Sequence, residues 1–132
     1  MRQRAIAAAT VVALALAAWF AVGRDARPGL ERAADLLDDP GRFDTGLESG
    51  ETLARVGALL LDDARRCRDD HGPVVRCQAR SSASAVAQVF AVEVLQCSAP
   101  GRFEARTRLA AYLDEVAAAG SAVPEPPDPP SC

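Results

Sequence analysis

Hydrophobic residues recur at helical spacing through most of the chain after Pro28, and no stretch alternates between apolar and polar positions as a strand would. A short segment with this spacing begins at Pro28. Three longer segments cover residues 51–67, 83–97 and 102–119, and each has an apolar side. We therefore expect an all-α fold, in which one short helix and three longer helices form a small bundle.

Glycine and polar residues predict where these helices are interrupted. Residues 41–50 contain three glycines and are expected to form a loop, and residues 69–80 are expected to form a polar loop. Ser81 or Ser82 would then cap the helix that follows. The helix over residues 83–97 has few polar side chains, so we expect it to be the most buried helix of the bundle.

The beginning of the chain has a different pattern. Residues 5–23 form an uncharged run of 19 residues between Arg4 and Arg24. A helix of that length spans about 28 Å, which is close to the thickness of the hydrocarbon core of a bilayer. The run is therefore expected to be either a membrane-spanning anchor or an export signal. Its length favours an anchor, whereas the small residues Ala21 and Gly23 suit cleavage of a signal.

The charges predict on which side of the membrane the rest of the chain lies. Arg2 and Arg4 precede the apolar run, and all 18 acidic residues lie beyond position 24. Positive flanks remain in the cytoplasm, so residues 24–132 are expected to be extracytoplasmic, either tethered to the cell membrane by a single pass or secreted. That part carries 13 arginines and 18 acidic residues, a formal charge of −5, which argues against nucleic-acid binding. The abundance of alanine and the use of arginine without lysine indicate a bacterial source.

The predicted organisation has four parts. Residues 1–23 are the anchor or signal, residues 24–50 hold the short helix and a linker, and residues 51–119 form the helical bundle. Residues 120–132 contain five prolines and are expected to be an extended tail in the polyproline II conformation.

The four cysteines predict two disulfides, because an even number of cysteines is usual in a small exported domain. An antiparallel hairpin of the second and third helices would favour Cys67–Cys77 together with Cys97–Cys132, and we prefer this pairing. A parallel arrangement would instead pair Cys67 with Cys97 and Cys77 with Cys132. No C-x-x-C motif is present, which argues against a redox enzyme.

Other candidates for chemistry are few. Cys67, His71, Cys77 and Cys97 could form a zinc site, but they lack the close pairs typical of such sites, so we expect neither metal nor cofactor. His71 is the only histidine and is expected to be a solvated loop residue. No catalytic motif is present, and we expect no enzyme activity.

Charged residues cluster near the second helix. The adjacent acids Asp62 and Asp63 are expected to be solvated surface charges. Five arginines could contact an anionic partner or could complement the dipole at the helix end, namely Arg65, Arg66, Arg68, Arg76 and Arg80.

These features predict a helical module that acts through contacts with a protein partner, which the sequence does not identify. The alternative is a small binding protein that holds an apolar or metal ligand among helices 51–67, 83–97 and 102–119.

Overall fold

The computed structural model describes residues 27–132, and the predicted anchor or signal over residues 1–23 lies outside them. The described residues form four α-helices and two short 3-10 helices, with no strand. The elements in chain order are α2 (Gly29–Leu37), η1 (Pro40–Phe43), α3 (Gly46–Asp69), α4 (Val74–Glu93), η2 (Val94–Gln96) and α5 (Ala99–Ala118). The all-α prediction is confirmed for this part of the chain. None of its helices is both long and apolar enough to cross a membrane.

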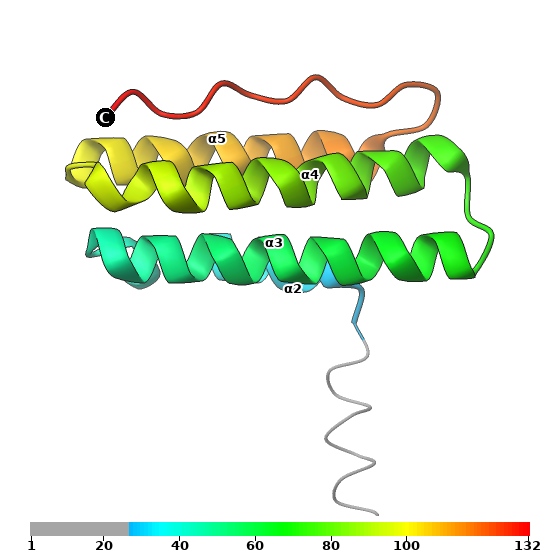
Figure 1. The fold of residues 1–132 in the computed structure, drawn as a ribbon, viewed down its shortest axis with the longest axis horizontal. Coiled ribbons are helices and arrows are strands. Elements are labelled where there is room, and N and C mark those ends of the chain that lie inside the picture. The colour runs from blue at the N-terminus through cyan, green and yellow to red at the C-terminus, as the bar shows by residue number, and fades with distance from the viewer. Residues whose placement is uncertain (1–26) are drawn as a thin grey trace, which may run out of the picture.

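The three long helices run up, down and up, and the short helix α2 packs against α3 and α5. In Figure 1, α3 and α4 lie in front of α2 and α5, and the C-terminal tail returns along α5. One apolar side of every helix faces the interior. The largest side chains that are fully buried there are those of Phe90, Leu37, Leu53, Leu60 and Leu109.

Residues 41–50 do not form the predicted loop. η1 occupies its first part, and α3 begins at Gly46. The Thr45 side chain caps α3 by accepting a hydrogen bond from the backbone N–H of Glu48, 3.1 Å away. Gly50 is buried against α4, where a Cβ would lie 3.1 Å from the carbonyl oxygen of Ala91. Gly50 therefore serves close helix packing here rather than a turn.

The polar loop predicted over residues 69–80 is also shorter than expected. α4 begins at Val74, so only residues 70–73 connect it to α3, and neither Ser81 nor Ser82 caps a helix. Cys77 and Ala79 are buried, which shows that the apolar side of α4 already begins in this segment.

His71, two residues after the last residue of α3, has a left-handed backbone conformation with φ of 55°. Its N–H donates to the carbonyl of Arg68 over 3.1 Å, and the N–H of Gly72 donates to the carbonyl of Cys67 over 2.8 Å. These two bonds form a Schellman motif, which satisfies carbonyls at the helix end. The motif reverses the chain within four residues, so α3 and α4 are antiparallel.

The disulfides join Cys67 to Cys77 and Cys97 to Cys132, which is the pairing favoured by the hairpin argument. Each disulfide lies against a glycine. A Cβ on Gly72 would lie 2.8 Å from the Sγ of Cys67, and a Cβ on Gly101 would lie 2.9 Å from the Sγ of Cys132. Larger residues at these two positions would displace the sulfur atoms.

The tail packs on α5 with a period of three residues. Pro124 and Pro127 are half-buried and Pro130 is buried. A polyproline II helix has three residues per turn, so these prolines lie on one side of it. Arg108 holds the tail further by donating to the carbonyl of Asp128 over 3.1 Å.

Candidate interaction surface

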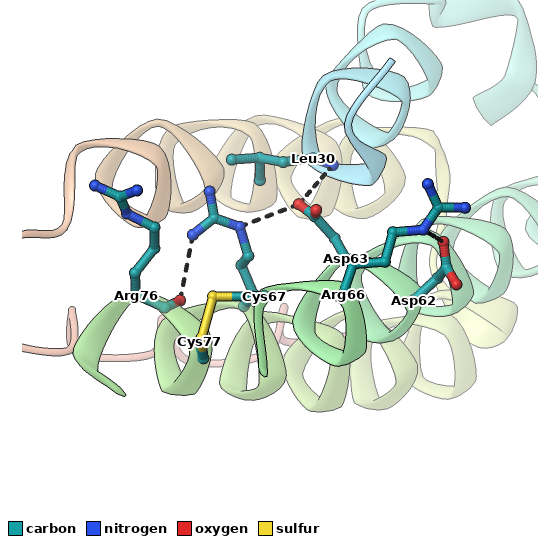
Figure 2. Close-up of polar contacts among 8 residues, drawn as sticks. Leu30, Asp62, Asp63, Arg66, Cys67, Arg76 and Cys77 are labelled. Carbon is teal, nitrogen blue, oxygen red and sulfur yellow. Dashed lines mark hydrogen bonds and ion pairs between the residues drawn. A yellow bond between two sulfur atoms is a disulfide. The ribbon is translucent and has the colours of Figure 1, made fainter. Parts of the chain in front are cut away.

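Asp63 joins three helices and is not the solvated charge that we expected. Its Oδ2 accepts hydrogen bonds from Arg80 Nε on α4 over 3.1 Å and from the backbone N–H of Leu30 on α2 over 3.2 Å (Figure 2). The side chains of Asp63 and Arg80 are only 12% and 15% exposed. Asp63 therefore caps α2, whose own N-cap residue is Pro28 and supplies no side-chain hydrogen bond.

The five arginines proposed as a partner contact do not form one surface. Arg80 is held in the internal ion pair, and Arg66 pairs with Asp62 over 3.0 Å at the surface. Arg66, Arg76 and Arg80 line a depression of about 360 Å³ on one side of the Cys67–Cys77 disulfide, together with two aspartates. Arg68 lines another depression, of about 580 Å³, beside His71, and Arg65 is exposed on α3. Because acids accompany this cluster, it offers little net charge to an anionic partner.

In the alternative metal site, Cys67, Cys77 and Cys97 would bind the ion as thiolates. All three are in disulfides and therefore offer no thiolate. His71 is exposed. Within residues 27–132 no group of three or more histidine, cysteine or acidic side chains is placed to hold a metal ion. Buried side chains of α3, α4 and α5 pack together in the interior, which is the region where the alternative prediction placed a ligand.

Two further arginines that the sequence did not single out have structural roles. Arg102 on α5 donates to the carbonyls of Phe43, Asp44 and Cys97 over 2.9–3.0 Å. Arg106 donates to the carbonyl of Leu37 at the end of α2. Both side chains satisfy carbonyls at helix ends that have no intrahelical partner.

The least expected surface is formed by α3 and α4 together. The helix predicted to be the most buried has a broad exposed side, on which Val89 and Val92 are 52% and 67% exposed. The neighbouring flank of α3 is also apolar. We call this surface the α3–α4 face, and it consists of Ala54, Ala58, Leu61, Ser81, Ala85, Gln88, Val89 and Val92. Figure 1 looks onto it.

The two halves of the α3–α4 face are continuous, because the helices beneath it pack closely. A Cβ on Gly57 would lie 3.0 Å from Cγ of Gln88 and 3.3 Å from the carbonyl oxygen of Ser84. Ser84 Oγ also donates a buried hydrogen bond of 2.7 Å to the carbonyl of Gly57. The face is therefore carried by two helices that are fixed to each other.

The α4 half of the α3–α4 face lacks charge over an unusual length for a protein with 25% charged residues. α4 has no charged residue between Arg80 and Glu93. These 12 residues cover about 18 Å of helix. A depression of about 510 Å³ lies on the face, lined by Ala85, Gln88, Val89, Val92 and Glu93. An exposed apolar surface of this extent is typical of a contact site.

A signal for this face is present in the sequence. Exposed uncharged residues of α4 alternate at intervals of four and three residues, the spacing of a helix-pairing stripe. They are Val74, Gln78, Ser81, Ala85, Gln88 and Val92, and Leu95 of η2 continues the series. The stripe was not predicted because the inward side of the same helix is apolar as well.

No family model, curated protein or solved structure matches the chain.

Proposed function

We propose that the chain is an exported bacterial helical module, tethered to the membrane or secreted, that acts through protein contacts and has no catalytic activity. The observation that carries this proposal is the α3–α4 face. It presents mostly apolar side chains on two closely packed helices.

Two further features support export. Disulfides persist in oxidising compartments, and this part of the chain contains two of them with no free cysteine. The uncharged run over residues 5–23 supplies a segment suited to an anchor or a signal.

The proposed contact can be tested in the producing bacterium with the full chain. A photo-crosslinking amino acid is placed at Ala58, in the middle of the α3–α4 face, or at Ala117, an exposed alanine of α5. We expect a covalent protein adduct from position 58 and none from position 117. Equal adduct formation at both positions, or none at position 58, would contradict the proposal.

Export is tested separately with a reporter that is active only outside the cytoplasm. Fused after Cys132, it should be active. An inactive fusion, with an active cytoplasmic reporter at the same place, would refute the extracytoplasmic location without bearing on the contact.

A further inference from the structure

Opposite charges flank the α3–α4 face at equal distances from its midpoint. Glu51 and Arg65 lie seven residues before and after Ala58 on α3, so all three share one side of the helix. Seven residues correspond to about 10.5 Å of helix on each side. Both charged residues are exposed, and within residues 27–132 neither has an ion-pair partner.

The same midpoint falls on a small residue of α4. Gly57 faces Ser84 and Gln88, so Ala58 lies level with Ala85 on the neighbouring helix. The centre of the face is therefore built from two exposed alanines, which allow another helix pair to approach closely. Larger apolar side chains lie toward the ends, where Val74 is 70% and Leu95 is 50% exposed.

From this arrangement we infer that the partner of the α3–α4 face is a second copy of the chain. The two-fold axis crosses α3 and α4 at the level of Ala58 and Ala85, and the helices of the two copies run antiparallel. The inference rests on the proposed function, because it names the occupant of the same face. Each Glu51 then lies opposite Arg65 of the other copy, and this contact occurs twice because a two-fold interface is self-complementary.

The position of the chain start fits the same axis. Gly29, at the beginning of α2, packs against the carbonyl of Leu59 on α3, close to the level of Ala58. A two-fold axis running from α3 to α4 leaves the chain starts of both copies on the α2–α3 side of the dimer. Two anchors formed by residues 5–23 could then enter one membrane. A two-fold axis parallel to the helices would place the two chain starts on opposite sides.

The size of the whole outer surface of α3 and α4, of which the α3–α4 face is the central part, suits a reversible dimer. Two helices about 30 Å long and about 10 Å wide present about 600 Å². Stable interfaces bury about 800 Å² on each partner. The rim pairs of Glu51 with Arg65 add selectivity for the antiparallel orientation rather than much affinity.

The test is a charge exchange between two copies of the full chain that carry different tags in the producing bacterium. Both copies have the photo-crosslinking residue at position 58. Glu51→Arg brings two arginines together twice in its own dimer, and Arg65→Glu brings two glutamates together twice. In a dimer of one copy of each variant, an arginine again lies opposite a glutamate at both contacts. Asp114→Arg, an acid-to-arginine change at an exposed site of α5, is the matched control.

We expect adducts containing both tags from the unaltered chain and from Asp114→Arg. Each charge variant paired with itself should give about tenfold less adduct, and the mixture of the two variants should restore it. Failure of the mixture to restore the adduct would overturn the inference. Adducts at position 58 that never contain both tags would also overturn it while leaving the proposed function standing, whereas absence of every adduct would overturn both.

Discussion

Removal of the Asp63 side chain should destabilise the protein far more than removal of its neighbour. Asp63→Ala leaves the guanidinium of Arg80, which is 15% exposed, without its carboxylate partner and deprives α2 of the side-chain cap at its N-terminus. Breaking a buried ion pair costs about 3–5 kcal/mol. This pair is slightly exposed, so we expect a loss of about 3 kcal/mol, of which about 1 kcal/mol comes from the cap.

Asp62→Ala is the matched control. It changes the same residue type at the adjacent position of α3, where Asp62 pairs with Arg66 and the two side chains are 55% and 67% exposed. An exposed pair contributes about 0.5 kcal/mol or less. The total free energy of unfolding of a domain of this size is about 5–15 kcal/mol, so the difference between the two variants is large on that scale.

The assay is urea unfolding of the oxidised protein, followed by far-ultraviolet circular dichroism. The double variant Asp63→Ala/Arg80→Ala removes the stranded charge and should recover part of the loss, leaving it about 1–2 kcal/mol less stable than the unaltered protein. Free energies of unfolding for Asp63→Ala and Asp62→Ala that agree within about 0.5 kcal/mol would refute the reasoning.

Three other changes are expected to alter stability in the same assay. Gly72→Ala should lower the free energy of unfolding by about 1–3 kcal/mol, because the added Cβ meets a disulfide sulfur at 2.8 Å. Gly120→Ala is the control and should be neutral, because its Cβ meets nothing within 4 Å. Equal effects of the two changes would contradict the packing argument. His71→Gly should raise the free energy of unfolding by about 0.5–1 kcal/mol, because glycine adopts the positive φ of this position without strain. His71→Ala should be close to neutral. A His71→Gly variant that is less stable than the unaltered protein would contradict this expectation. Replacing Cys97 and Cys132 by serine should cost about 2–5 kcal/mol, and an unchanged urea midpoint would show that the tail disulfide contributes nothing.

The helices could be predicted from the sequence because their apolar residues recur at helical spacing. Leu53, Val56 and Leu60 of α3 and Leu109 and Val116 of α5 lie at this spacing, and all are buried. The preferred disulfide pairing depended on an antiparallel hairpin, in which the length of α4 separates Cys97 from Cys77 by more than a disulfide can bridge. A parallel arrangement of the helices left the other pairing open.

The helix starts were harder to predict because their signals compete. The three glycines of residues 41–50 suggested a loop, although Thr45 and Glu48 have the spacing of a capping box. Whether these residues form a loop or the start of a helix depends on the elements that pack against them. Gly46 and Gly50 lie against η2 and α4, and their contacts become visible only when the helices are packed together.

The role of Asp63 was beyond prediction from the sequence. Its partners Leu30 and Arg80 lie 33 and 17 residues away in the chain, and the adjacent Asp62 has the same local environment in the sequence. Only the packing of α2 and α4 on α3 turns one of these two acids inward. The exposed side of α4 could not be predicted from the sequence for a related reason. The valines on that side have the same apolar character as residues that face the core.

The measurement that tests the central claim most directly is a disulfide map of the full chain, purified without reductant. The claim is that an antiparallel helical bundle is closed by two disulfides. Mass spectrometry of the unreduced protein should give a mass lower by four hydrogen atoms than the reduced protein. Digestion should yield linked peptides that contain Cys67 with Cys77 and Cys97 with Cys132. Free thiols, or peptides linking Cys67 to Cys97, would contradict it.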